Sequence, residues 1–253
     1  RAGALRFGQG RFEPPIPVRR ADELGDLAGQ VNTMAGEIRD RLEAQRGLLL
    51  AVSHELRSPL TRARLNAELV APGDSRDALL RDLGTMRDLI SDLLESERLA
   101  AGHAALQREP VDLNVLVRAV VDEQFAQAAL QLHLAEGLPQ AEIDAVRLRL
   151  ALRNLIDNAL RHGAAAATPP CITTRVADGQ LQISVRDFGP GVDEAQLARL
   201  SEAFYRADVA RQRSTGGVGL GLYLCRLVAQ AHGGTLTIRN ASPGLELTLG
   251  LPA

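Results

Sequence analysis

The sequence predicts a fold in two parts, in which a long α-helical hairpin precedes an α/β sandwich. Apolar residues recur every three or four positions from Leu24 to Leu60, the spacing of one apolar helix stripe, and a second such stripe begins at Leu79. After Gly102 the pattern changes to short alternating runs and turns between helical segments. Because two helices alone leave their stripes exposed, we expect the hairpin to form a dimeric four-helix bundle with a second copy.

Size and composition limit the functions that the chain can have. It contains 253 residues, with 29 basic and 31 acidic side chains and a net charge of -2. This mixed balance gives no general attraction to nucleic acid, so DNA binding is not favoured. Cys171 and Cys225 lie in no metal-ligand spacing, which indicates a reducing compartment and buried thiols. No apolar run approaches the roughly 18 residues that span a bilayer, so we expect a soluble fragment.

Two helix-breaking segments organise the first part: one precedes it and the other divides it into two helices. Prolines within residues 14–17 predict an extended connector, so a helix can begin only after them. The segment 71–75 interrupts the helical pattern and predicts the turn of the hairpin.

The second part predicts one mostly antiparallel sheet that carries helices. Asp178-Gly179 between two alternating runs is a strong hairpin signal. Expected strands are 131–134, 172–176, 181–186, 236–239 and 245–249. Expected helices are 113–127, 145–162 and 218–231.

Polar residues occur at helical spacing inside the otherwise apolar segment 145–162. Asn154, Asn158, Arg161 and His162 are three or four positions apart and therefore share one helix face. An amide oxygen suits Mg²⁺, which takes the rest of its ligands from water and nucleotide phosphates. This helix face thus offers an amide ligand for Mg²⁺, with an arginine one turn later that can neutralise phosphate.

Two glycine-rich segments accompany this helix. Asp187 follows an expected strand, and Gly189 and Gly191 let the backbone approach a ligand closely. A buried carboxylate there can accept a hydrogen bond from the amine of adenine. The second segment, 216–222, opens the last long helix, where free N–H groups favour phosphate. Each segment alone is a weak signal, because glycines before a helix often serve only a turn.

Together and in this order, these segments resemble the ATP-binding domain of histidine kinases, the Bergerat type shared with Hsp90-like, gyrase-type and mismatch-repair ATPases. Residues 201–206 resemble the aromatic box before the ATP lid of those kinases. Residues 52–60, which include His54, are similar to the phosphoacceptor box of the commonest histidine kinase class. The earliest part of the chain, in which residues 22–25 open the first apolar stripe after the proline connector, resembles the second half of a HAMP linker. The resemblance covers residues 22–251.

The resemblance implies a sensor histidine kinase that phosphorylates its own His54 with Mg-ATP. It further implies transfer of the phosphoryl group to an aspartate of a response regulator, and phosphatase activity toward that regulator. The expected domains are a connector and HAMP-like half (1–40), a dimerisation and phosphotransfer hairpin (41–104) and a catalytic ATP-binding domain (105–253). The natural protein would be a homodimer, and this chain the cytoplasmic portion of a bacterial inner-membrane protein.

The same resemblance assigns site residues. The catalytic residues would be His54, Glu55 and Ser58, and Asn158 would also bind Mg²⁺. The ATP-binding residues would be Asn154, Asn158, Arg161, His162, Asp187, Gly189, Gly191, Phe204, Arg206, Thr215, Gly217, Gly219, Leu220, Gly221 and Leu222. Two departures keep the chemistry: Ser58 stands where threonine is frequent, and Arg161-His162 where lysine and an aromatic are frequent.

The residues around His54 fit a phosphoacceptor. Val52 and Leu56 fall on the apolar stripe, so His54 between them should project to solvent. Phosphoryl transfer requires an unprotonated nitrogen in line with the γ-phosphate. Glu55 can accept a hydrogen bond from Nδ1, which leaves Nε2 as the nucleophile. The remaining histidines match no functional position and are interpreted as ordinary surface or turn residues: His103, His133 and His232.

Two other function classes share parts of this pattern. An ATPase clamp of the Hsp90 or mismatch-repair kind would use the nucleotide segments but has no use for His54 on a helical hairpin. A non-catalytic signalling scaffold would work by conformational relay between helices. The sequence also leaves open whether each ATP-binding domain serves its own histidine or that of its partner, because the hand of the hairpin turn decides this.

Overall fold

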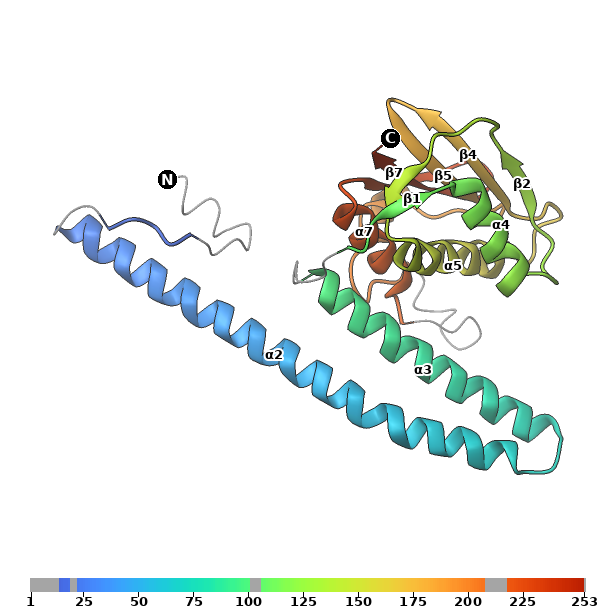
Figure 1. Cartoon of the computed structure of the whole chain (residues 1–253), viewed down its shortest axis with the longest axis horizontal. Helices are drawn as coiled ribbons and strands as arrows, with labels where there is room; N and C mark the ends of the chain where they lie inside the picture. Colours follow the sequence, from blue (N-terminus) through green and yellow to red (C-terminus); the bar gives the residue numbers. More distant parts are fainter. Residues whose placement is uncertain (1–13, 19–21, 101–105, 208–217, 253) are drawn as a thin grey trace. The chain divides into compact units, whose positions relative to one another are not determined.

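The computed structural model describes residues 14–18, 22–100, 106–207 and 218–252 (Figure 1). A few side chains inside the first helix lie outside this description: Glu43, Gln45, Arg46, Leu50 and His54. The chain divides into two units, residues 1–84 and 85–253, and each is described by itself. Within the described ranges, no helix combines the length and apolar character required to cross a lipid bilayer.

Helix α2 (Glu23–Glu68) dominates the first unit (Figure 1). It begins after Asp22, whose side chain accepts a hydrogen bond from the Gly25 N–H at 3.1 Å and so satisfies one free helical donor. Residues 14–18 form no helix, as their prolines predict. Asn32 holds this connector, because its side chain accepts from Ile16 N and donates to Ile16 O, each at 2.8 Å.

Helix α2 does not end at Pro59, which lies in its interior. Proline lacks the N–H that would bond to the carbonyl of Glu55, so the helix loses one bond there. The helix continues to Glu68, where Arg76 closes the hairpin. Nε and Nη2 of Arg76, on helix α3 (Asp74–Ala100), donate to the carbonyls of Ala67 and Glu68, each at 3.2 Å. The bond to Glu68 satisfies a carbonyl that the helix end leaves free, whereas the Ala67 carbonyl also accepts from Val70 N at 3.2 Å.

The hairpin leaves apolar side chains of α2 in contact with solvent. Val52 and Leu56 are 45% and 41% exposed, whereas Ser53 between them is 4% exposed. Further exposed apolar side chains follow the predicted stripe toward the start of α2: Leu42, Ile38, Met34, Leu27 and Leu24. Within the described residues, this face of α2 is therefore left in contact with solvent.

A mixed five-stranded sheet forms the frame of the second unit, with strand order β2-β4-β5-β7-β6. The strands are β2 (Gln131–Leu134), β4 (Cys171–Ala177), β5 (Gln180–Arg186), β6 (Thr235–Asn240) and β7 (Leu245–Pro252). β2 runs parallel to β4, and the other neighbours are antiparallel, which confirms the predicted sheet. Asp178 and Gly179 connect β4 to β5 with φ of 53° and 69°, the geometry of a tight hairpin.

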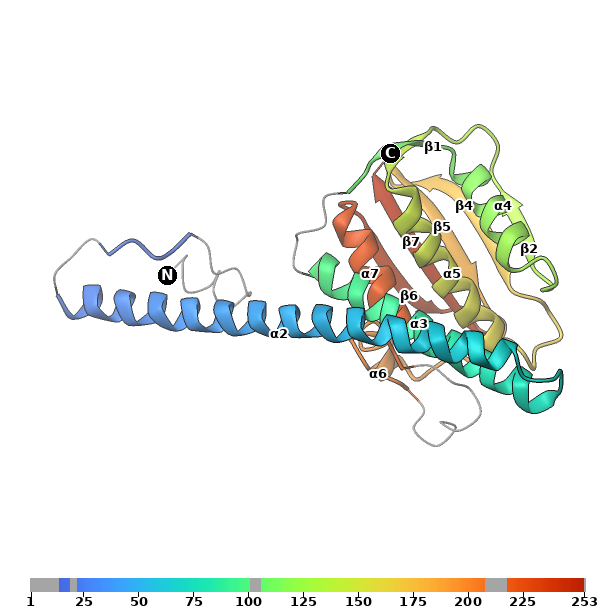
Figure 2. The ribbon, with the colours of Figure 1, turned by 60° about the horizontal axis from the view of Figure 1, so that its bottom comes forward.

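Three helices cover one face of this sheet (Figure 2): α4 (Leu113–Gln124), α5 (Ala145–His162) and α7 (Gly221–Ala231). Leu152 and Ile156 of α5 are fully buried with Ile183 and Leu249 of the sheet in one apolar core. The bounds of α5 confirm the predicted helix 145–162. Both cysteines are free, and Cys225 is buried as expected, whereas Cys171 is only partly buried.

Some predicted boundaries were wrong, and short elements were missed. Helix α7 begins at Gly221 rather than at 218, because Gly219 has a φ of 80° that a helix cannot use. Helix α4 ends at Gln124 rather than 127, because Phe125 leaves the helical region and is buried. The missed elements are β1 (Glu109–Val111), β3 (Ala141–Ile143) and the short α6 (Glu194–Leu197).

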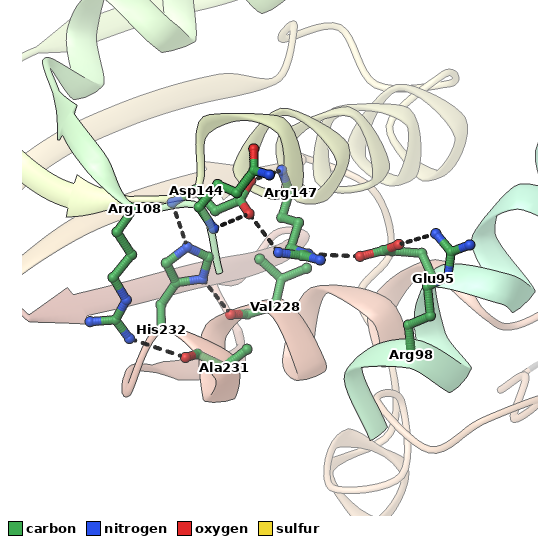
Figure 3. A network of polar contacts seen from close by, with 9 residues as sticks. Glu95, Arg98, Arg108, Asp144, Arg147, Val228, Ala231 and His232 are labelled. Carbon is green, nitrogen blue, oxygen red and sulfur yellow. Dashed lines mark hydrogen bonds and ion pairs between the residues drawn. The ribbon is translucent and has the colours of Figure 1, made fainter. Parts of the chain in front are cut away.

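A polar network centred on Asp144 fixes the start of α5 (Figure 3). Oδ1 of Asp144 accepts from Arg147 N at 3.1 Å, and Oδ2 accepts from Gln107 N at 3.1 Å and pairs with the Arg147 guanidinium. Arg147 also donates to Glu95 of α3 at 2.8 Å. Burial alone would raise the pKa of Asp144, but these hydrogen bonds and the Arg147 charge hold it below its usual value. The network thus joins the end of α3 to α5.

His232 belongs to the same network. It stands in the turn after α7, as the sequence suggests, but it is not an ordinary surface residue. Its side chain is 3% exposed. Nε2 accepts from Asp144 N at 3.0 Å, and Nδ1 lies 2.8 Å from the Val228 carbonyl, to which it donates. Only the neutral ring with its proton on Nδ1 makes both bonds. Burial lowers the pKa of His232, and the charges of Arg108 and Arg147 lower it further.

This burial predicts a loss of stability in mild acid. Below the unfolded-state pKa of 6.5, unfolded His232 binds a proton that the folded chain excludes, so the free energy of unfolding falls with pH. Urea titrations at about pH 7.5 and about pH 5.5 measure this fall. We expect His232→Gln to be less stable at neutral pH but to lose less stability in acid than the parent. His133→Gln, on an exposed strand residue, should keep the parent's pH dependence. An unchanged fall in His232→Gln would contradict the prediction.

Candidate functional site

The polar segments singled out in the sequence meet at the C-terminal end of α5. A methyl group at Gly189, in the loop after β5, would collide with the carbonyl oxygen of His162. A methyl group at Gly221, the first residue of α7, would lie 2.7 Å from Oδ1 of Asn154. Glycine permits both approaches because it has no side chain. The structure therefore brings Asn154 and His162 together with both glycine-rich segments.

Asp187 lies directly after β5 and is only 2% exposed. Its Oδ1 accepts hydrogen bonds from the backbone N–H groups of Gly189 at 2.8 Å and Leu245 at 3.2 Å. Its Oδ2 makes no hydrogen bond to any described residue. Oδ2 is thus the oxygen of this carboxylate that remains available, and it fits a donor supplied by a ligand. The amine of adenine, which the sequence suggests, is such a donor.

Asn158 offers a second group suited to a ligand. It is partly exposed on α5, and its side chain has no hydrogen-bond partner in the part of the chain that the structure describes. Asn154, one turn earlier, instead donates to the carbonyl of Leu150 at 3.0 Å. The free amide oxygen of Asn158 therefore fits the Mg²⁺ ligand that the sequence predicts.

Positive charge gathers near Asp187. The surrounding chain desolvates His162 and lowers its pKa, although the ring keeps contact with solvent. The charge of Asp187 opposes this shift, and the charges of Arg161 and Arg206 add to it. Both arginines are therefore close enough to His162 to act on it electrostatically. Such a cluster can attract the negative charge of a nucleotide's phosphates.

The start of α7 is tied to the aromatic box. Leu220 precedes the helix and provides no side-chain cap, which leaves the first-turn N–H groups suited to an anion. The carbonyl of Gly219 accepts a hydrogen bond from Phe204 N at 3.0 Å. Phe204 has a φ of 63° and is 59% exposed. A bulky residue with a positive φ is held there by its surroundings, as functional sites often require.

Several predicted site residues belong to the first unit or lie outside the described residues. Glu55 and Ser58 are exposed on α2, in the other unit. Thr215 and Gly217 lie outside the described residues, as do His103 and the side chain of His54.

The turn between β6 and β7 contributes to the site but was missed in the sequence. Leu245 N donates to Asp187, and a methyl group at Gly244, whose φ is 87°, would collide with the Asp187 backbone. Pro243-Gly244 is a turn signal. It could not show that this turn lies against Asp187, because the pairing of β5 with β7 decides that.

Three protein families match the chain in succession. Residues 1–40 match the HAMP domain, and residues 44–102 match the His Kinase A phospho-acceptor domain. Residues 143–253 match the family of histidine kinase-, DNA gyrase B- and HSP90-like ATPases.

Individual proteins show the same likeness. The chain is 33% identical over 276 residues to the signal transduction histidine-protein kinase AfsQ2 of Streptomyces coelicolor, across 98% of this chain and 51% of that protein. It is 31% identical over 264 residues to BaeS of Escherichia coli, across 99% and 56%. The chain thus spans about half the length of these relatives. The crystal structure of full-length ShkA in complex with AMPPNP matches 81% of this chain and 45% of that one, with a TM-score of 0.68 and 29% identity.

The order of the three family matches, the curated relatives and the fold agree with one another. The helical hairpin followed by an α/β sandwich is the architecture that the resemblance implies. The chain belongs to the sensor histidine kinase family.

Proposed function

We propose that the chain is an ATP-dependent protein-histidine kinase that phosphorylates His54. The bond between the γ-phosphorus and its bridging oxygen breaks, a phosphorus–nitrogen bond to His54 forms, and ADP leaves. The observation that supports this most is the cluster of Asp187, Asn158 and the uncapped start of α7 in a chain that also carries a matched phosphoacceptor segment. ShkA, whose structure contains an ATP analogue, supports the same function.

The residues of the site would divide the work of binding. Oδ2 of Asp187 would accept from the adenine amine, and the start of α7 with Arg161 and Arg206 would hold the phosphates. Asn158 would hold Mg²⁺, which when bound neutralises phosphate charge. The remaining predicted residues would line the walls of the nucleotide site. They are Asn154, His162, Gly189, Gly191, Phe204, Thr215, Gly217, Gly219, Leu220, Gly221 and Leu222. Glu55 would orient the ring of His54 by accepting from Nδ1.

Incubation with γ-labelled ATP and Mg²⁺ tests this function. A histidine kinase retains label on the protein that survives alkali and is lost in acid, because phosphohistidine is acid-labile. Release of labelled phosphate without labelled protein would identify an ATPase clamp instead. Absence of both would identify a non-catalytic scaffold.

We further propose that residues 41–104 form a homodimer. The exposed stripe on α2, with Val52 and Leu56, supports this, because contiguous exposed apolar faces mark protein contacts. Light scattering at micromolar concentration should show two copies.

The proposed domains are residues 1–40, 41–104 and 105–253. The HAMP match supports a cytoplasmic position for the chain in an inner-membrane sensor. The proposed acceptor of the phosphoryl group is an aspartate of a response regulator.

We propose that Ser58 takes part in dephosphorylating that regulator. Ser58 lies one turn after His54, is exposed, and makes no side-chain hydrogen bond within the described residues. Its hydroxyl is therefore available to position a water molecule. The alternative is a helix residue that only accommodates Pro59.

Ser58→Ala should keep autophosphorylation and transfer but slow removal of phosphate from the regulator by about one to two orders of magnitude. The decay of purified phosphorylated regulator, mixed with kinase, ADP and Mg²⁺, measures this. Thr61→Ala removes another exposed hydroxyl from α2 and should leave the decay unchanged. If the phosphorylated regulator decays equally fast with Ser58→Ala and with the parent, Ser58 has no role in dephosphorylation beyond its place in the helix.

A further inference from the structure

Asn240, the last residue of β6, forms two hydrogen bonds with the loop that follows Asp187. Its Oδ1 accepts from Val192 N at 3.2 Å, and its Nδ2 donates to Val192 O at 2.8 Å. One side chain thus satisfies both backbone groups of a loop residue. The loop passes so close that a methyl group at Gly191 would lie 2.9 Å from Oδ1 of Asn240.

Arg186, the last residue of β5, holds the turn between β6 and β7, which begins directly after Asn240. Its Nη2 donates to the carbonyls of Ala241 at 2.9 Å and Pro243 at 3.3 Å. Its guanidinium lies 4.6 Å from the centroid of the Phe188 ring. Arg186 and Phe188 flank Asp187 in the chain, so the residues on both sides of this carboxylate are fixed.

The β6–β7 turn also lies against Asp187 itself. Leu245, directly after the turn, donates to Oδ1 of Asp187 at 3.2 Å and accepts from Asp187 N at 2.9 Å. Ala241 N donates to Gly244 O at 2.8 Å, which closes the turn. The turn therefore helps to occupy Oδ1 and leaves Oδ2 for a ligand.

We propose that Asn240 and Arg186 are positioning residues for recognition of the adenine base. They clamp the β6–β7 turn and the loop 187–192 together, so that backbone donors fix Oδ1 of Asp187 and Oδ2 stays in place for the base amine. This inference rests on the proposed function, because Asp187 reads adenine only if the site binds ATP. A preorganised acceptor discriminates strongly between ligands, and a displaced one does not.

Base selectivity separates positioning from mere support of the hairpin. Asn240→Ala weakens the hairpin in either case, but only loss of positioning removes the preference for an amine. Purine riboside 5′-triphosphate lacks the 6-amino group of ATP and keeps the phosphates and ribose. The ratio of its dissociation constant to that of ATP therefore reports on recognition of the 6-amino group, which the proposed site assigns to Asp187.

Calorimetry with the whole 253-residue chain measures this ratio. We expect the parent to prefer ATP by about tenfold or more, since a hydrogen bond to a charged group is lost with the analogue. Asn240→Ala should reduce that preference by roughly threefold to tenfold, through weaker binding of ATP. Arg239→Ala is the matched control, because it removes an ion pair between the exposed Arg239 and the partly buried Glu246 from the same hairpin. It should keep the parent's preference.

Arg186→Lys provides a second variant, which keeps the charge but lacks the guanidinium that reaches both carbonyls. It should also lose preference for ATP, and it decides the matter if Asn240→Ala fails to fold. Folded variants with the parent's preference would overturn the inference while leaving the proposed function intact. A parent chain that binds neither nucleotide would instead refute the proposed function.

Discussion

His54→Ala is expected to abolish incorporation of label from γ-labelled ATP. The imidazole nitrogen is the proposed nucleophile, and an alanine side chain cannot replace it. The variant should bind ATP as tightly as the parent, because the proposed nucleotide residues all belong to the other unit. Labelling measures the first property and calorimetry the second. His133→Ala, which removes an exposed histidine of β2, should incorporate label like the parent.

The pair of measurements also identifies a wrong assignment. If His54→Ala still accumulates acid-labile phosphate, another histidine is the acceptor. If it loses ATP binding as well, the substitution has disturbed the fold, and the loss of label says nothing about His54 chemistry.

Asp187→Asn is expected to weaken ATP binding by about two orders of magnitude. The amide keeps the shape and the Oδ1 acceptor, but it can place an N–H donor at the position where Oδ2 is proposed to accept from the amine of adenine, so two donors would then face each other. Autophosphorylation at limiting ATP should fall to a similar extent. Asp178→Asn is the matched control, because Asp178 is exposed in the β4–β5 turn.

Asn158→Ala should lose autophosphorylation for a different reason. It removes the proposed Mg²⁺ ligand, so the gain in ATP affinity on adding Mg²⁺ should shrink. Titrations with and without Mg²⁺ separate this effect from loss of the adenine contact. If either variant binds Mg-ATP as tightly as the parent, the nucleotide site does not include that side chain.

The sequence by itself determined the elements whose signals are local. The bounds of α5 followed from apolar periodicity, and the β4–β5 hairpin followed from Asp178-Gly179, because both patterns report on neighbouring residues. The segments around His54, Asn158 and Asp187 were recognisable for the same reason. The periodicity of α2 also predicted a helical hairpin, and apolar side chains of its stripe are exposed in the described part of the chain.

Only the tertiary structure decided how these segments are held. Leu245 reaches Asp187 across 58 positions, Asn240 reaches Val192 across 48, and Asp144 reaches His232 across 88. A histidine after a helix looks like a turn residue until packing buries it and fixes its proton on Nδ1. No periodic pattern in the sequence predicts hydrogen bonds between residues so far apart, because these bonds depend on which strands pair and which helix covers them.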